Sequence, residues 1–338
     1  MNDKPIVTVI SLGGTIASTP STESGLAGPR LTARDLVSAV PEIERLAEVE
    51  VIDLARLPSC DLGFELAIAV AGAVNAAADR GSSGVVVTQG TDTIEEMSYC
   101  LDILVTSDVP VAVVGAMRHS GLPGADGLAN LLDAARTVLN PSARGLGCMV
   151  VVNSEIHSAR TVRKLHTSSP SAFSSEVVGP IGWISEGVPQ LRNRPFARTV
   201  LELPPEVNIV RPPLVKITMD DDGWWLPAIK EGRSGGLVIE GTGGGHVPSR
   251  LADEIVEIAQ QLPVVLTSRA GAGDVLSSTY GGFKGSETYL IAGGLIPGGS
   301  LDGIKARILL ALLLMAEVDR VAIDHEIATA GRLSRHGG

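Results

Sequence analysis

Two threonine-bearing turns are the segments of this sequence best suited to chemistry. They occupy residues 12–18 and 88–93, and glycine directly precedes the threonine in each, Thr15 and Thr91. Glycine lets backbone N–H groups approach a ligand closely, and the start of a helix after Thr91 offers unpaired donors to a carboxylate or an oxyanion. Each turn alone is typical of a tight turn or a helix cap. Two of them at equivalent positions of one sheet favour a functional site.

The segments around the turns predict such a sheet. Short, continuously apolar segments alternate with amphipathic ones, which is typical of a parallel sheet covered by helices on both faces. Ligands bind at the carboxyl ends of such strands, and both turns fall there. The expected strands are 6–11, 50–54, 84–89, 109–114 and 148–152, and the expected helices are 33–40, 64–79 (capped by Asp61), 92–105 and 126–139.

A proline-rich stretch indicates a domain boundary. Proline recurs between residues 195 and 213, with few helix signals between. Beyond it the alternation resumes, with expected strands at 214–219, 236–239, 264–268 and 289–292 and expected helices at 248–259 and 301–318. We therefore expect an α/β protein with a large N-terminal parallel-sheet domain (1–193), a linker (194–210) and a smaller C-terminal α/β domain (211–338).

Composition excludes several classes of protein. The net charge of −11 disfavours nucleic acid or an anionic membrane as a partner. The longest apolar run, 308–316, is far shorter than the ~20 residues of a membrane span. The first residues lack the basic and long apolar regions of a signal peptide. Cys60, Cys100 and Cys148 have no metal-binding spacing, so we expect reduced thiols in a cytoplasmic protein.

Several standard catalytic motifs are missing from the sequence. There is no GxxxxGK[ST] loop, GxSxG elbow or HExxH pair, and the glycine-rich run 241–246 fails GxGxxG because its sixth residue is His246. We therefore expect no cofactor and no metal. His157, His325 and His336 lie in polar stretches and are expected to be solvated.

The motifs together resemble those of the bacterial-type L-asparaginase/glutaminase family. The paired threonine turns are specific to that family, and the resemblance covers nearly the whole chain in order. It implies a large amino-terminal α/β domain and a smaller carboxy-terminal one. The matching segments are 12–18, 88–96, 115–118 with 125–127, 160–167, 239–243, 263–269 and 305–307.

The resemblance also implies catalytic roles. Thr15 matches the threonine that attacks the amide carbon and forms an acyl-enzyme, while Thr91, Asp92 and Lys164 match the triad that relays protons and positions water. A threonine hydroxyl needs a base nearby, and lysine becomes one only when burial or neighbours lower its pKa. Apart from the resemblance, Lys164 would be an ordinary surface lysine.

Substrate-binding roles follow from the same resemblance. Ser59 matches the serine that binds the substrate α-carboxylate, Asp92 would hold the substrate ammonium, and Ala116 matches a backbone carbonyl that receives the amide nitrogen. The candidate substrate-binding residues are Gly14, Ser59, Cys60, Gly90, Asp92 and Ala116.

Three departures from the family pattern concern substrate recognition. The loop 18–31 lacks the family's tyrosine, and the candidates to replace it are Ser21, Thr22, Ser24, Arg30 or another element. Cys60 replaces a glutamine, and a thiol is a poor hydrogen-bond partner. His246 replaces an asparagine, and the acidic residue that a neighbouring subunit lends in the family is not identifiable, with Asp274 and Glu287 as candidates only.

The leading hypothesis is a cytoplasmic L-asparaginase, working without cofactor as a homo-oligomer (dimer or tetramer). The alternatives are a hydrolase of another small amide or imide, a catalytically weak sensor, and the asparaginase-like amidotransferase subunit that acts on charged tRNA. The intact quartet Thr15, Thr91, Asp92 and Lys164 argues against the sensor. The net charge, and a first strand that begins at Ile6 without an extra domain before it, argue against the amidotransferase.

Overall fold

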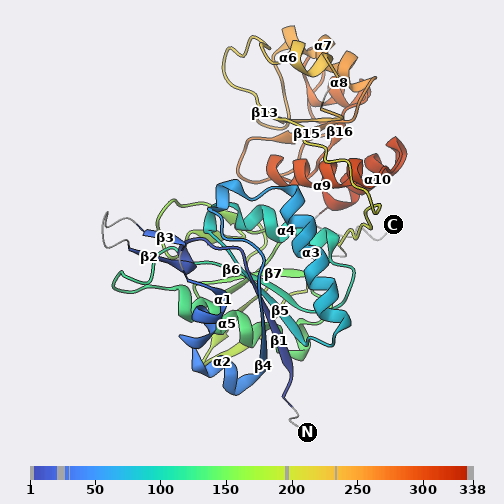
Figure 1. Ribbon diagram of the computed structural model, residues 1–338. Coiled ribbons are helices and arrows are strands. Elements are labelled where there is room, and N and C mark those ends of the chain that lie inside the picture. The colour runs from blue at the N-terminus through green and yellow to red at the C-terminus, as the bar shows by residue number, and fades with distance from the viewer. Residues whose placement is uncertain (1–3, 21–26, 30, 195–197, 233, 333–338) are drawn as a thin grey trace. The chain divides into compact units, whose positions relative to one another are not determined.

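The computed structural model describes residues 4–20, 27–29, 31–194, 198–232 and 234–332. The chain forms two compact units, residues 1–200 and 201–338. Each unit is an α/β layer structure built on its own sheet (Figure 1).

The first unit is built on an eight-stranded sheet with the order β12-β11-β8-β7-β6-β5-β1-β4 among the described residues. The five strands from β7 to β4 are parallel, as the sequence predicts. Strands β8, β11 and β12 extend one edge of the sheet in antiparallel pairs, which the sequence did not predict. The bounds are β1 Ile6–Ser11, β4 Glu48–Asp53, β5 Gly84–Thr88, β6 Val111–Val114, β7 Cys148–Val152, β8 Glu155–Ser158, β11 Gly182–Ser185 and β12 Val188–Leu191.

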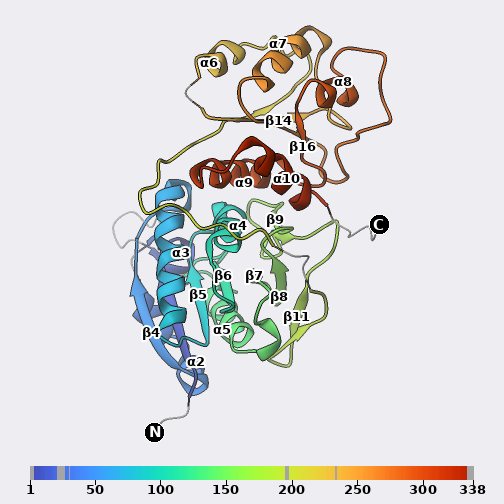
Figure 2. The same ribbon diagram turned by 90° about the vertical axis from the view of Figure 1, so that its right-hand side faces the viewer.

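Helices cover both faces of this sheet. Helices α1, α2 and α5 pack on one face, and α3 and α4 lie on the other (Figures 1 and 2). The central strands are buried on both sides, so they consist almost wholly of valine and other aliphatic residues. The bounds are α1 Ala33–Ser38, α2 Pro41–Leu46, α3 Phe64–Asp79, α4 Ile94–Leu104 and α5 Gly127–Val138.

Several helix boundaries differ from the sequence prediction; the helix expected at 301–318, for example, spans Gly303–Met315. The helix expected at 33–40 ends at Ser38, and a second helix begins at Pro41, where proline suits a first helical position. Gly63, and not Asp61, is the N-cap of α3. Asp61 instead closes the 3-10 turn Ser59–Asp61.

Two short ribbons lie outside the main sheet. β2 (Ser18–Pro20) pairs with β3 (Ala27–Pro29), and β9 (Arg163–Lys164) pairs with β10 (Phe173–Ser174), each pair antiparallel. Further 3-10 turns are Thr15–Ala17, Thr91–Thr93 and Pro141–Ala143.

The second unit has a parallel sheet with the order β13-β14-β15-β16. Helices α6, α7 and α8 cover one face, and α9 and α10 cover the other (Figure 2). The bounds are β13 Leu214–Lys216, β14 Leu237–Gly241, β15 Val264–Ser268, β16 Ile296–Pro297, α6 Leu226–Lys230, α7 Ser249–Ala259, α8 Glu287–Ala292, α9 Gly303–Met315 and α10 Arg320–Ala330.

One predicted strand of this unit is wrong. Residues 289–292 belong to helix α8, whose N-cap Ser286 accepts a hydrogen bond from the backbone N–H of Tyr289. A short apolar run has the same appearance in a buried strand and in a buried helical turn. Across the described part of the chain, no helix combines the length and the apolar character that crossing a membrane requires.

A buried carboxyl group of helix α4 contacts the start of β7. The Asp102 side chain on α4 accepts a hydrogen bond from the backbone N–H of Cys148, 2.8 Å away. The guanidinium of Arg198 donates to the Asp102 carbonyl at 3.0 Å. Burial raises the pKa of Asp102 to about 6, despite that hydrogen bond and the nearby guanidinium groups.

This burial predicts a pH-dependent stability difference. The unfolded chain loses the Asp102 proton near its ordinary pKa of 3.8, but the folded chain keeps it until about pH 6. Stability from this group is therefore present below pH 4 and lost as pH rises to 6, by at most about 3 kcal/mol. Asp102→Asn keeps the acceptor for Cys148 and removes the titration. Urea unfolding should show the variant gaining stability relative to the parent between pH 4 and pH 8, and an unchanged difference would contradict this account.

Candidate active site

The two threonine turns meet at the carboxyl edge of the main sheet. Each follows directly after its strand, β1 or β5, and the backbone N–H of Leu12 donates to the carbonyl of Thr88 at 2.8 Å. Thr15 begins one 3-10 turn, and Thr91 begins another that leads into α4. The adjacent parallel strands thus place both turns side by side, as the sequence predicts.

The close approach of the turns requires glycine on both sides. A Cβ on Gly14 would lie 1.9 Å from the backbone nitrogen of Gly90, and Gly14 has a φ of +83°. A Cβ on Gly90 would lie 2.8 Å from Ser59 Oγ. No other residue allows these backbones to touch without displacing one turn.

Lys164 joins the second turn through its side chain. Its Nζ donates to Thr91 Oγ1 at 2.9 Å and to Asp92 Oδ1 at 2.7 Å. Thr91 is buried, and the Lys164 side chain is 13% exposed. The structure therefore brings together the three residues expected to form the triad, from β9 and from the turn after β5.

Asp92 remains open to a ligand while it holds this contact. The hydrogen bond from Lys164 lowers the pKa of Asp92 below its ordinary value, although burial opposes the shift. The carboxylate is therefore charged at neutral pH. Its side chain is 67% exposed, so it is accessible to a cation.

Ser59 lies against Asp92 as well. Its hydroxyl donates to Asp92 Oδ2 at 3.2 Å, and it accepts from the Asp92 backbone N–H at 3.3 Å. The Thr93 hydroxyl donates to the Ser59 carbonyl at 2.9 Å. These bonds attach the 3-10 turn of Ser59 to the second threonine turn, although 33 residues separate Ser59 from Asp92 in sequence.

The backbone around Ala116 is held by two residues to which the sequence gave no role. The Asp126 carboxylate accepts from the N–H groups of Met117 and Arg118, at 3.0 and 2.8 Å. Asn130 donates to the Gly115 carbonyl at 3.0 Å. Asp126 is the N-cap residue of α5, but its side chain makes no capping hydrogen bond and binds this loop instead.

The other expected site residues are placed as follows. The Cys60 side chain is exposed, with Sγ 3.9 Å from Asp61 Oδ1. In the second unit, His246 Nε2 lies 2.9 Å from Glu287 Oε2, whereas Asp274 is exposed. Ser21, Thr22, Ser24 and Arg30 of the 18–31 loop lie outside the described residues.

His157 corrects an expectation from the sequence. We predicted a solvated side chain, but only 1% of it is exposed. Its polar neighbours in sequence suggested a solvated residue, whereas the ring is buried with its Nδ1 3.1 Å from Ser175 Oγ.

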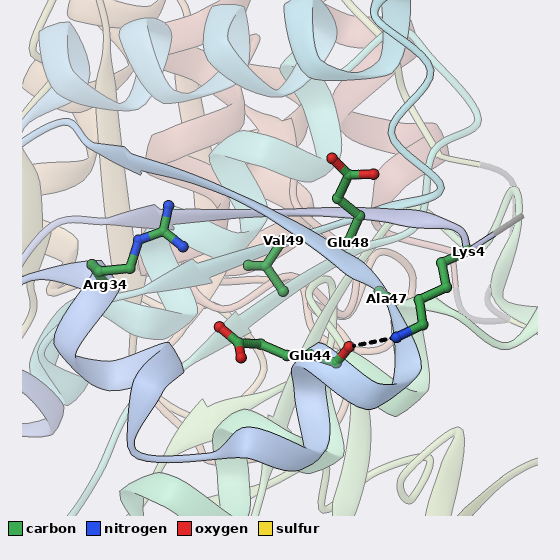
Figure 3. A pocket seen from close by; sticks show the side chains of 6 residues that line it. All are labelled: Lys4, Arg34, Glu44, Ala47, Glu48 and Val49. Carbon is green, nitrogen blue, oxygen red and sulfur yellow. Dashed lines mark hydrogen bonds between the residues drawn. The ribbon is translucent and has the colours of Figure 1, made fainter. Parts of the chain in front are cut away.

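Two pockets of the first unit differ in their chemistry. One, of about 330 Å³, is lined by Asp92 and Lys164 together with Glu95, Leu165, His166 and Thr167. The other, of about 220 Å³, lies near the amino ends of β1 and β4, where Lys4 donates to the Glu44 carbonyl (Figure 3). None of the expected site residues lines the second pocket, whereas Asp92 and Lys164 line the first.

Both units match models of known protein families. The model described as "Asparaginase, N-terminal" matches residues 6–197, and "Glutaminase/Asparaginase C-terminal domain" matches residues 213–325. The chain belongs to the asparaginase family. Family homologues are amidohydrolases that act on C–N amide bonds, and this chain is an enzyme of that class.

Individual relatives agree over most of the chain. An L-asparaginase from Bacillus licheniformis is 33% identical over 93% of this chain and 96% of its own length. The crystal structure of a probable cytoplasmic L-asparaginase from Campylobacter jejuni is similar with a TM-score of 0.84 at 31% identity, over 96% of this chain and 99% of that one. A glutamyl-tRNA(Gln) amidotransferase component from Methanosarcina mazei is 30% identical, over 82% of this chain and 67% of its own. The family therefore does not by itself fix the substrate.

The glycine contact gives a direct test of the site. Gly14→Ala should abolish most amidase activity and destabilise the chain, since a non-glycine residue at positive φ alone costs about 1–3 kcal/mol and the new Cβ also clashes with backbone. Gly72→Ala on α3 is the matched control, because its Cβ meets nothing within 4 Å. Thermal unfolding should show that Gly72→Ala is as stable as the parent or more stable, and ammonia release should show parental activity. Parental activity in Gly14→Ala would contradict the close contact.

Proposed function

We propose that this amidohydrolase converts L-asparagine to L-aspartate and ammonia through a threonine acyl-enzyme. The observation that carries the proposal is the Lys164 ammonium within hydrogen-bond distance of both Thr91 and Asp92, at the sheet edge where the Thr15 turn touches Gly90. The L-asparaginase relatives support asparagine as the substrate.

In the first half-reaction, Thr15 is the nucleophile. Its Oγ attacks the amide carbon, and backbone N–H groups at the start of the Thr91 turn stabilise the oxyanion. The C–N bond then breaks as the nitrogen takes up the threonine proton, so ammonia leaves and the acyl group stays on Thr15.

In the second half-reaction, Lys164 and Thr91 activate water. For this step the Lys164 ammonium first gives up one proton, and Thr91 then passes its own proton to Nζ and takes one from the water. The resulting hydroxide attacks the acyl carbon, and Thr15 leaves with the proton that Lys164 returns. The Asp92 carboxylate holds Lys164 in position through the 2.7 Å hydrogen bond.

The remaining residues would bind the substrate. Ser59 takes the α-carboxylate, the exposed Asp92 takes the ammonium, and the Ala116 carbonyl receives the amide nitrogen. The backbone at Gly14 and Gly90 would line the reacting carbon.

A second candidate substrate is a small amide or imide that lacks the amino-acid head group. Cys60 favours it, because an exposed thiol stands where the family pattern has glutamine. A lost recognition hydrogen bond weakens binding of the head group without altering the Thr91, Asp92 and Lys164 contacts.

We further propose a cytoplasmic homo-oligomer, a dimer or tetramer. Large apolar side chains at the surface of the second unit support it, with Trp224 79% exposed and Met219 94% exposed. Light scattering at assay concentration tests this assembly, and an active monomer would refute it.

Removal of either threonine hydroxyl should stop turnover. Thr15→Val and Thr91→Val are nearly isosteric, and each should lower kcat on the order of 10³-fold or more. When catalytic groups act as a unit, the loss of one costs nearly as much as the loss of all. Ammonia release is the measurement, with circular dichroism to confirm folding. A folded variant with near-parental kcat would show that its threonine has another role.

Cys60→Gln should improve asparagine binding. A regained hydrogen bond to a charged head group contributes ~1.5–3 kcal/mol, or roughly a ten- to hundred-fold lower KM. Reaction with a simple carboxamide such as propionamide should not change. Cys60→Ala is the matched control, since it removes the thiol without adding an amide. An asparagine KM that is equal in Cys60→Gln and Cys60→Ala would contradict this explanation of the departure.

A further inference from the structure

Lys164 stands on a ribbon that the main sheet does not hold. Its strand β9 pairs only with β10 in the described part of the chain, with Lys164 opposite Phe173 and Arg163 opposite Ser174. A two-stranded ribbon is marginally stable by itself. The position of the Lys164 ammonium therefore depends on contacts that attach this ribbon to the rest of the unit.

A polar contact closes the base of the ribbon. Thr161 lies two residues before β9, and Ser175 follows β10 directly. The Thr161 hydroxyl donates to Ser175 Oγ at 3.3 Å. Ser175 is 2% exposed, and the contact as a whole is partly buried.

His157 connects that base to the main sheet. It belongs to β8 and pairs with Val150 of β7, which places its backbone firmly in the eight-stranded sheet. Its Nδ1 lies 3.1 Å from Ser175 Oγ. The chain His157–Ser175–Thr161 is thus a polar bridge from the sheet to the base of the Lys164 ribbon, with His157 and Ser175 buried.

The hydrogens of the bridge have a consistent assignment. Since Ser175 accepts from Thr161, its own hydrogen is available to His157 Nδ1, which then accepts as the neutral Nε2–H tautomer. Burial lowers the pKa of His157 to about 4, so the ring is neutral at physiological pH. Nε2 lies 3.3 Å from Glu155 Oε2, without the alignment of a hydrogen bond.

We propose that His157 is a positioning residue for Lys164, acting through Ser175 and Thr161. The proposal rests on the proposed function, in which Lys164 moves protons for Thr91. Loss of the bridge would let the ribbon shift, and the 2.9 Å contact between Lys164 and Thr91 would lengthen. Misplacement by about 1 Å can cost roughly 100-fold in rate.

Two substitutions separate this role from simple packing. His157→Phe keeps a ring of similar volume but has no acceptor for Ser175. His157→Asn loses volume but keeps an oxygen close to the place of Nδ1. If His157 only fills space, Phe is the milder change; if it positions Lys164, Asn is.

The experiment measures kcat and KM for asparagine together with thermal stability. His157→Phe should lower kcat roughly 10- to 100-fold with little change in KM, because the substrate-binding residues are untouched. His157→Asn should retain most of the activity even if it is the less stable variant. Ser175→Ala should reproduce the kcat loss and decides the matter if His157→Phe does not fold.

Controls distinguish the possible failures. Thr137→Val removes a similarly buried hydrogen bond, to the Asp133 carbonyl on α5, away from the ribbon, and should alter stability but not kcat. Parental kcat in both His157→Phe and Ser175→Ala, or activity that follows stability in all variants, would overturn the positioning role. Lys164→Met is measured in parallel: if it stays active, the proposed function fails as well, and if it is inactive, only the inference about His157 is in question.

Discussion

The contact between the Gly14 and Gly90 backbones is the constraint on which the rest of this site depends. The parallel register of β1 and β5 delivers both turns to one edge, but only two residues without side chains let them touch. The same contact limits what can stand nearby, since a Cβ on Gly90 would also meet Ser59. The two threonines, Ser59 and Asp92 thus share one small region because glycine occupies two positions.

The elements that position this region were largely predictable from sequence. Continuous valine segments such as Gly84–Thr88 occur where a strand is buried on both faces. In the helix Phe64–Asp79 the apolar residues recur with helical spacing. The threonine turns were recognisable because glycine and threonine follow directly after such strands. Thr91 and Asp92 could therefore be placed at the correct edge from the sequence alone.

What the sequence could not supply is contact between distant segments. Ser59 reaches Asp92 across 33 residues, and Lys164 reaches Thr91 across 73, from a two-residue strand with no local signal. His157 was misjudged because its polar neighbours along the chain do not reveal its buried contact with Ser175, 18 residues further on. The prediction of a strand at 289–292 was wrong for a related reason, because four apolar residues fit either a strand or the helix that Ser286 caps.

The central claim is that Thr15 carries the acyl group while Thr91 and Lys164 activate the attacking water. It is tested most directly by acid quenching during steady-state turnover of isotopically labelled asparagine, followed by peptide mass mapping. The account predicts the labelled acyl group on Thr15 of the parent, and its accumulation there in Thr91→Val and Lys164→Met. Label on Thr91, or no covalent label in any of the three proteins, would contradict it.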